Sequence, residues 1–359
     1  MPAIHQFVAG FNDGDAISNE SRVLRRIFRE WGYESEIFCE ARRIFPRLRK
    51  ETLDVSTFAP ADRPENIVLL HLSIGSPVNE AFAALRCGKA ILYHNITPSH
   101  YFNVINPQTA YSLDRGRDAV RALANVASVN MADSRFNANE LTEAGYRDVR
   151  VLPLILDLNA LRTPPDPAIL KNLRDGRTNV LFVGRCAPNK KIQDTLLAFF
   201  HFKRFVEPDS RFIHVGSFAG MERYHAFLLS MARELDVESF RFVGTATQAQ
   251  LNAFYACASL FLCMSEHEGF CIPLIESMVH GVPVIAYAAG AVPETMDGAG
   301  ILFREKQYGL VAEMMGRAVH DSRFRAAVVQ GQRERVARYQ RRDLAGELRG
   351  HLAPLLARK

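Results

Sequence analysis

Two glutamates eight positions apart, Glu268 and Glu276, stand where this 359-residue chain most strongly indicates ligand binding. The apolar run 258–264 before them is typical of a buried parallel strand, and 272–279 has helical periodicity. A strand that passes through Ser-Glu-His-Glu-Gly into a helix leaves backbone N–H groups unpaired at the helix start, which favours an anion such as a diphosphate. About two helical turns separate the carboxylates, so each can contact one end of a ligand. The alternative is a helix cap and a solvated side chain.

Strands in the second half repeatedly end in a glycine or another small residue. Gly184, Gly216 and Gly244 each follow an apolar run, so the backbone can approach a ligand closely at this edge. Arg185 and Lys190 follow the first of these strands, where a guanidinium fork and an ammonium can hold phosphate oxygens.

Two histidines occupy matching places in the first half. His71 lies near the end of the strand expected at 66–72, and His94 follows the strand expected at 90–93. Ligand sites of α/β sheets collect at the carboxyl ends of strands, which makes both histidines candidates, although a lone histidine is more often structural. The Asp-Gly-Asp sequence at 13–15 is explained better by turn chemistry than by a metal-binding carboxylate pair.

Composition excludes several classes of protein. The net charge of +5 does not by itself indicate nucleic-acid binding. The six cysteines have no CxxC spacing and are interpreted as free thiols of a reducing cytoplasm, not as a disulfide or zinc framework. The N-terminus lacks signal-peptide features, and no apolar stretch reaches the roughly 20 residues of a spanning helix. A cytoplasmic protein is expected, and any membrane contact would be peripheral.

The order of elements predicts two doubly wound halves. A strand at 4–11, a helix from 18 or 19 to 31 and a strand at 35–39 form a βαβ opening, and strand–helix alternation continues to 154. The Pro-rich segment 163–167 is the natural linker. Thereafter the same alternation restarts, and it ends in a basic amphipathic helix expected at 333–348.

Residues 41–50 combine five basic residues with three apolar ones, and four arginines of the first helix add to this basic patch (Arg22, Arg25, Arg26 and Arg29). A solvated surface explains it slightly better than attachment to an anionic membrane or a lipid phosphate acceptor.

Many positions of the second half together resemble the family 4 retaining glycosyltransferases of the GT-B fold. The matching residues, in order, are Gly184-Arg185 with Lys190, Gly244 with Leu251 and Tyr255, Ser265-x-x-Glu268-Gly-Phe, Glu276, Gly281-Val-Pro-Val, and Gly290 with Glu294. The resemblance covers essentially the whole C-terminal half and reaches the first half through 134–157.

The resemblance implies an α/β protein with two Rossmann-like parallel-sheet domains that face each other across a cleft. The expected divisions are an acceptor-binding domain at 1–160, a linker at 161–177, a nucleotide-sugar-binding domain at 178–335, and a C-terminal helix at 336–359 that packs back on the first domain.

By resemblance, Glu268 contacts the donor sugar and Glu276 the ribose. Arg185 and Lys190 match the basic pair on the diphosphate, and His94 looks like the histidine beside the transferred sugar. The remaining donor-side candidates are Gly184, Gly244, Gly269, Phe270, Cys271 and Ile272. The acceptor-side candidates are Gly14, Asp15, His71 and Tyr101. No metal and no cofactor are expected, since the basic pair and the helix start can stabilise the leaving diphosphate.

Two departures from the family pattern affect this expectation. The first loop has the sequence Asn-Asp-Gly-Asp-Ala at 12–16 in place of a Gly-Gly pair, and Lys191 stands where a glycine commonly follows the basic residue. Most of the divergence lies in the first half, which usually selects the acceptor.

The expected reaction is transfer of a hexose of mannose or glucose type from GDP-mannose, UDP-glucose or a related nucleotide sugar. The acceptor would be a glycan or a lipid-linked intermediate of surface polysaccharide biosynthesis, at the inner face of the membrane if the basic patch binds lipid. Alternatives are a nucleotide-sugar epimerase or phosphorylase-like enzyme on the same fold, or a non-catalytic nucleotide-sugar-binding subunit. A dehydrogenase is disfavoured because no GxGxxG opens either half.

Overall fold

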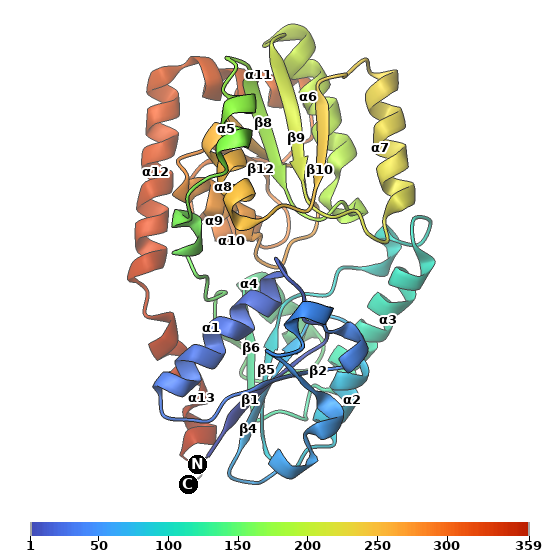
Figure 1. Ribbon diagram of the computed structural model, residues 1–359, viewed down its shortest axis with the longest axis vertical. Coiled ribbons are helices and arrows are strands. Elements are labelled where there is room, and N and C mark those ends of the chain that lie inside the picture. The colour runs from blue at the N-terminus through green and yellow to red at the C-terminus, as the bar shows by residue number, and fades with distance from the viewer. Residues whose placement is uncertain (1, 358–359) are drawn as a thin grey trace. The chain divides into compact units, whose positions relative to one another are not determined.

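The computed structural model describes residues 2–357, and its internal contacts divide the chain into two compact units. Unit 1 comprises residues 2–100, 108–157 and 343–357, and unit 2 comprises 101–107 and 158–342. Each unit holds one parallel sheet with helices (Figure 1). Among the described residues, no helix has both the length and the apolar character that crossing a membrane requires.

Unit 1 has, in its described residues, a seven-stranded sheet of order β3-β2-β1-β4-β5-β6-β7, in which every pairing is parallel. The strands are β1 (Ile4–Val8), β2 (Ile37–Cys39), β3 (Leu53–Asp54), β4 (Ile67–Leu72), β5 (Gly88–Tyr93), β6 (Val129–Ala132) and β7 (Arg150–Val151). The helices are α1 (Ala16–Glu30), α2 (Pro77–Ala83), α3 (Pro107–Ala122), α4 (Arg135–Glu143) and α13 (Leu344–Leu356).

Helix α1 shows how the sequence fixes element boundaries in unit 1. The carboxylate of Asp15 accepts a hydrogen bond from the Ser18 backbone N–H and so caps the first turn. Gly32, with a φ of 86°, follows the last turn in a conformation that most other residues avoid. The predicted strand–helix–strand opening is therefore confirmed, with β1 shorter than expected.

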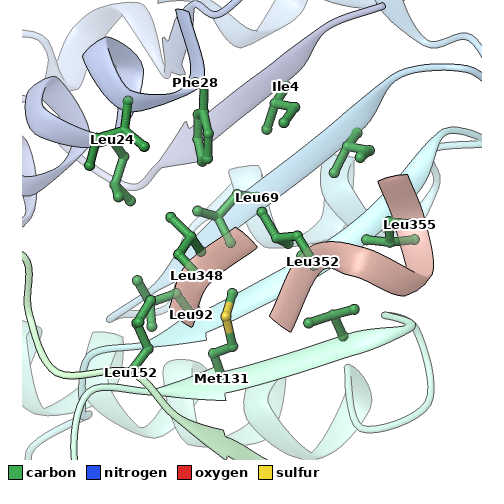
Figure 2. Close-up of a cluster of buried hydrophobic side chains, with 14 of the residues drawn as sticks. Ile4, Leu24, Phe28, Leu69, Leu92, Met131, Leu152, Leu348, Leu352 and Leu355 are labelled. Carbon is green, nitrogen blue, oxygen red and sulfur yellow. The ribbon is translucent and has the colours of Figure 1, made fainter. Parts of the chain in front are cut away.

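The core of unit 1 depends on the last helix of the chain. Leu348, Leu352 and Leu355 of α13 are buried among side chains of the sheet and of α1 (Figure 2). Leu69 and Met131 are two of the sheet residues in this cluster. The C-terminal segment therefore completes the hydrophobic core around the first strands of the chain, and burying apolar area of this kind stabilises the fold.

Unit 2 has, in its described residues, a six-stranded parallel sheet of order β10-β9-β8-β11-β12-β13. The strands are β8 (Thr178–Val183), β9 (Ser210–Val215), β10 (Phe240–Gly244), β11 (Leu260–Cys263), β12 (Val284–Tyr287) and β13 (Ile301–Phe303). The helices are α5 (Pro167–Leu173), α6 (Ile192–Phe205), α7 (Glu222–Glu234), α8 (Gln248–Cys257), α9 (Ile272–Val279), α10 (Val292–Met296), α11 (Tyr308–His320) and α12 (Ser322–Arg341).

Both sheets reverse their strand order at one place, between β1 and β4 in unit 1 and between β8 and β11 in unit 2. In open parallel sheets, ligands bind outside the carboxyl ends of the strands at such a reversal. The loops that follow β1, β4, β8 and β11 are therefore where the candidate residues should lie.

Three expected elements differ from the structure. The range 161–177, expected as a linker, contains the 3₁₀ turn η6 (Ala160–Arg162) and α5, and its contacts place it in unit 2. The single tail helix expected at 333–348 is two helices, because the chain leaves helical geometry at Arg342 and α13 starts anew behind the cap Asp343. The helical stretch expected at 100–125 is shorter, since α3 begins at Pro107.

Candidate active site

The ends of the first strands of unit 2 lie too close together for side chains. A Cβ on Gly216, after β9, would stand 1.9 Å from the carbonyl oxygen of Gly184, after β8. Gly244, at the end of β10, lies next to Gly216, because its carbonyl accepts a hydrogen bond from the Gly216 N–H at 2.8 Å. The predicted donor-side glycines Gly184 and Gly244 thus share one edge of the sheet, which bare backbone forms.

The loop before α9 is fastened to the loop after β8. Asn189 lies in the 3₁₀ turn η7 (Pro188–Lys190). Its side-chain amide donates to the His267 backbone carbonyl at 3.1 Å, and its backbone carbonyl accepts from the Glu266 N–H at 2.9 Å. Gly290 supports the same loop from the other side, because a Cβ there would lie 2.6 Å from the Glu268 carbonyl oxygen. The two loops that flank the strand-order reversal therefore form one rigid assembly.

Helix α9 begins as expected and presents unpaired donors. No side chain caps it, and its N-cap Cys271 has a φ of 70°. Among the described residues, the N–H groups of 269–272 have no hydrogen-bond acceptor. Four such donors at the positive end of a helix dipole form an anion site, and they belong to the predicted residues Gly269, Phe270, Cys271 and Ile272.

Lys190 and Glu268 form the central charged pair of unit 2. The Lys190 Nζ lies 2.6 Å from Glu268 Oε2, and the Glu268 side chain is only 8% exposed. Burial lowers the pKa of Lys190, but the adjacent carboxylate outweighs this effect and the net shift is upward. Lys190 therefore carries its charge at neutral pH beside the unpaired N–H groups of α9.

Glu276 lies on α9 and faces α8. Its Oε2 accepts a hydrogen bond of 2.7 Å from the Tyr255 hydroxyl. Burial raises the pKa of Glu276, and the Tyr255 hydroxyl reduces that shift. The partly buried glutamate is therefore held by the Tyr255 hydroxyl, which argues against the freely solvated side chain that the sequence left open.

Arg185 and Lys191 lie in different surroundings from Lys190. Arg185 donates from Nη2 to the Ala219 carbonyl at 3.0 Å, and its side chain runs toward the loop after β9. Lys191 has a φ of 50°, the left-handed region that glycine prefers, which explains why glycine is common at this position in the family that the sequence resembles. Its Nζ pairs with Glu266 Oε2 at 3.1 Å.

The structure adds a charged group that sequence reasoning missed. Lys306 contacts Asp194 Oδ2 at 2.6 Å and Glu266 Oε1 at 2.8 Å. The Tyr101 hydroxyl donates to Glu266 Oε2 at 3.4 Å, and this expected acceptor-side residue belongs to unit 2. Lys306 follows a strand and belongs to no recognisable motif, so no sequence pattern indicated its role. The one available signal for these contacts was that Glu266 lies two positions before Glu268.

In unit 1 the structure brings the two predicted histidines together. His71 Nδ1 lies 2.9 Å from His94 Nε2, and the two rings are nearly parallel. Glu20 Oε2 lies 3.7 Å from His94 Nε2, and Asp133 Oδ2 lies 3.5 Å from His94 Nδ1. We call these four residues, whose side chains are buried, the histidine cluster. Its two carboxylates were not predicted, because both sit within helical or strand-end patterns that resemble ordinary surface or capping positions.

Burial and charge act in opposite directions within the histidine cluster. Burial raises the pKa of Glu20 to about 7. Burial also lowers the pKa of His71 well below its usual value, and the neighbouring His94 adds to this. For His94, burial lowers the pKa, but Asp133, Glu20 and Asp15 outweigh it and the net shift is upward. The cluster therefore pairs a neutral His71 with a His94 that favours its charged form.

Gly14 and Asp15, also predicted on the acceptor side, form the turn that starts α1. Gly14 has a φ of 69°, and Asp15 accepts from both the backbone N–H and the hydroxyl of Ser18. This supports the turn interpretation of the Asp-Gly-Asp sequence.

Two groups of three side chains in the described residues have ligand atoms close enough to hold a metal ion. One is Glu20, His71 and His94, and the other is Cys263, Glu268 and Cys271, each with ligand atoms within 4.8 Å of one another. In the second group the Lys190 ammonium already occupies Glu268.

The basic patch of the first half is largely ion-paired. Arg22 pairs with Glu51 at 2.9 Å and Arg29 with Glu36 at 2.7 Å. The other patch arginines in ion pairs are Arg25, Arg26, Arg42, Arg43 and Arg47, which pair with Glu36, Glu51, Glu30, Glu40 and Asp13. This supports the solvated-surface interpretation.

Residues 170–335 match the family model described as glycosyl transferases group 1. The chain is 22% identical over 265 residues to O-antigen chain mannosyltransferase B of Escherichia coli, covering 67% of this chain and 68% of that protein. It is 35% identical over 117 residues to a GDP-mannose-dependent alpha-mannosyltransferase of Mycolicibacterium smegmatis, covering 32% of this chain. That match spans only 27% of the length of the mycobacterial protein.

Solved structures resemble the chain over its whole length. Sucrose-phosphate synthase of Thermosynechococcus elongatus has a TM-score of 0.77 at 16% identity and covers 99% of this chain and 100% of that one. The Anabaena protein Alr3699/HepE, solved in complex with UDP and glucose, has a TM-score of 0.76 at 17% identity and covers 99% of both chains. At identities this low, the structural likeness establishes the fold alone. The chain therefore has the GT-B fold, and its residues 170–335, most of unit 2, match the group 1 glycosyltransferases.

Proposed function

We propose that the chain is a retaining hexosyltransferase that takes a mannose- or glucose-type sugar from a nucleoside diphosphate sugar without a metal ion. The observation that carries this proposal is the position of Lys190 beside Glu268 and the unpaired N–H groups of 269–272. Both lie where the strand order of the unit 2 sheet reverses. A diphosphate is the ligand whose charge and size fit an ammonium together with four backbone donors.

Loss of the diphosphate is the step that these groups would assist. The bond between the anomeric carbon and the diphosphate oxygen breaks, and negative charge grows on the leaving group. Lys190 and the start of α9 would stabilise that charge, each well-placed donor contributing about 3 kcal/mol. This stabilisation can replace a metal, and Glu276 would hold the ribose.

The pairing of Glu268 argues against a covalent intermediate in the proposed retaining reaction. Because the Lys190 ammonium holds its carboxylate at 2.6 Å, Glu268 is a poor nucleophile and a better partner for sugar hydroxyls. We therefore favour attack by the acceptor hydroxyl on the face that the diphosphate leaves. In this proposal Arg185 contacts the diphosphate and His94 contributes positive charge to the transferred sugar.

The comparisons support a hexose donor at the level of its class. Relatives are named as mannosyltransferases, one of them GDP-mannose-dependent, and a structural neighbour is solved with UDP and glucose. The O-antigen relative favours a glycan or lipid-linked acceptor in surface polysaccharide biosynthesis. Peripheral membrane contact on the cytoplasmic side stays part of the proposal, with the ion-paired basic patch as an argument against it.

The test is a transfer reaction with GDP-mannose or UDP-glucose, each with excess EDTA. We expect release of GDP or UDP that depends on an added acceptor glycan, and a product whose anomeric proton coupling in NMR shows the configuration of the donor. A product of inverted configuration would contradict the retaining mechanism. Conversion of the nucleotide sugar into an isomer without any acceptor would instead support the epimerase alternative. Tight binding of the nucleotide sugar without turnover would support the non-catalytic binding subunit.

A further inference from the structure

The hydrogen bonds behind His94 determine where its ring carries protons, and they start at Gln6, a buried residue of β1. The Gln6 side-chain amide donates from Nε2 to the Ser21 carbonyl at 2.9 Å. A backbone carbonyl can only accept, so the amide orientation is fixed. The other end of the amide, Oε1, lies 3.0 Å from His71 Nε2 and can only accept from it.

This contact fixes the tautomer of His71. Because Gln6 Oε1 accepts, His71 Nε2 must carry a hydrogen. The ring is fully buried and its pKa is lowered, so it is neutral and its Nδ1 is a bare acceptor. The atom that faces this Nδ1, at 2.9 Å, is Nε2 of His94. His94 must therefore donate from Nε2.

A proton fills the space between the two rings better than a metal ion does. Two ligand nitrogens at about 2.05 Å from a tetrahedral zinc lie about 3.3 Å apart. The observed 2.9 Å between His71 Nδ1 and His94 Nε2 is instead the usual length of a hydrogen bond.

The other nitrogen of His94 has a different environment. His94 Nδ1 is buried, and the Asp133 carboxylate lies 3.5 Å away from it. A carboxylate at this distance favours a hydrogen on Nδ1, since a bare nitrogen lone pair would face negative charge. Nδ1 thus carries a hydrogen that faces the Asp133 carboxylate.

We propose that Gln6 and His71 are positioning residues that commit the Nε2 proton of His94, so that His94 cannot act as a base through Nε2. The consequence for catalysis rests on the proposed function of His94. The proton positions do not, because they follow from contacts within unit 1. His94 would place positive charge near the transferred sugar, and it would not remove a proton from the acceptor through Nε2.

The test uses the full chain labelled with ¹⁵N at histidine. Long-range ¹H–¹⁵N correlation spectra distinguish protonated from bare ring nitrogens, and His71→Asn and His94→Gln variants assign the two rings. We expect His71 with hydrogen on Nε2 alone and His94 with hydrogen on Nε2 at neutral pH. A His94 ring with bare Nε2 would overturn the proposal, whether or not the protein transfers sugar.

Two substitutions of His71 separate positioning from packing. In His71→Asn the side-chain oxygen can take the place of Nδ1 and accept from His94, whereas His71→Leu offers no acceptor. With the nucleotide sugar that gives turnover, we expect His71→Leu to lower kcat about 10- to 100-fold with little change in KM, and His71→Asn to restore most of it. Equal loss in both variants would show that His71 only fills space.

Gln6→Met keeps the test decisive if His71→Leu does not fold. It removes the acceptor that fixes His71 and preserves the volume of the side chain. We expect the spectrum of His71 to show a mixture of tautomers, and the spectrum of His94 to lose its defined Nε2–H signal. Unchanged spectra of both rings would contradict the relay from Gln6.

Discussion

The two units place their candidate residues at the carboxyl ends of parallel strands near the sheet centre but use different chemistry there. In unit 2 the carboxyl ends of β8 and β11 lead into Lys190, Glu268 and a helix start with unpaired N–H groups. In unit 1 the ends of β4 and β5 lead into His71 and His94, which are buried with two carboxylates.

The difference lies in what carries the charge. Unit 2 uses an ammonium and backbone dipoles, whose charge does not change near neutral pH. Unit 1 uses imidazole and carboxyl groups whose protonation depends on burial, and Glu20 has a pKa raised to about 7. A fixed positive site suits a leaving diphosphate, whereas a titratable cluster suits control of a single hydrogen bond. The same arrangement of strands therefore supports two separate tasks.

The largest expected effect is on the fixed charge of unit 2. Lys190→Met should lower kcat about 100- to 1,000-fold, because the leaving diphosphate loses a charged donor. Steady-state kinetics measure this, with the melting temperature recorded to detect any cost of leaving Glu268 buried and unpaired. The control is Lys191→Met, which removes a neighbouring charge that pairs with Glu266 instead. Loss of less than about tenfold in Lys190→Met would remove Lys190 from the proposed leaving-group site.

The next effect concerns the titratable charge of unit 1. A carboxyl group whose pKa is higher in the folded state than in the unfolded state binds its proton more tightly when folded. Glu20 should therefore destabilise the fold progressively as pH rises from about 4.5 to about 7, by about 1.4 kcal/mol per pH unit, and no further above that.

Glu20→Gln should remove this dependence. Urea unfolding of the wild type and the variant at pH 5 and pH 8 measures it, with the solvent-exposed Glu30→Gln as control. We expect Glu20→Gln to gain stability relative to the wild type at pH 8 and little at pH 5. The same difference at both pH values would mean that the carboxyl group of Glu20 keeps an ordinary pKa.

A smaller effect is expected at Glu276, where unit 2 would bind the nucleoside. Glu276→Gln keeps an acceptor for the Tyr255 hydroxyl but loses the negative charge that would hold the ribose. We expect KM for the nucleotide sugar to rise about tenfold with kcat nearly unchanged. Tyr255→Phe is the matched control, and a larger effect there than at Glu276 would indicate that the pair serves packing only.

The smallest effect is expected at the basic patch. Of its residues at 41–50, Arg49 and Lys50 make no ion pair within the part of the chain that is described, so only about 2 kcal/mol of attraction to an anionic surface is available. Sedimentation with phosphatidylglycerol vesicles at physiological salt should leave most of the protein in solution. Strong binding that is lost in Arg49→Ala with Lys50→Ala would revive the membrane interpretation.

Local patterns were sufficient for much of unit 2. Helix α9 has the predicted boundaries, and strand β11 lies within the predicted apolar run 258–264, because apolar periodicity marks both elements. The pairing of Lys190 with Glu268 links positions 78 residues apart, and the family resemblance indicated only that both residues serve the donor, not that they pair. Lys306 was missed because its partners Asp194 and Glu266 come from distant loops.

The site in unit 1 was harder to predict. His71 and His94 were identified by their places at strand ends, but Glu20 lies within α1 and Gln6 within β1, where a polar residue in a buried strand gives no sign of its partner. The break at Arg342 was also missed, since basic residues continue through it without a proline or glycine. Contacts between segments far apart in the chain determine each of these features.

The most direct measurement of the central claim is calorimetric titration of UDP and of GDP into the wild type and Lys190→Met in the presence of EDTA. We expect one of the two diphosphates to bind the wild type without a metal ion, and Lys190→Met to bind it at least about tenfold more weakly. Binding that disappears with EDTA, or that Lys190→Met leaves unchanged, would contradict a metal-independent diphosphate site beside Lys190 and the start of α9.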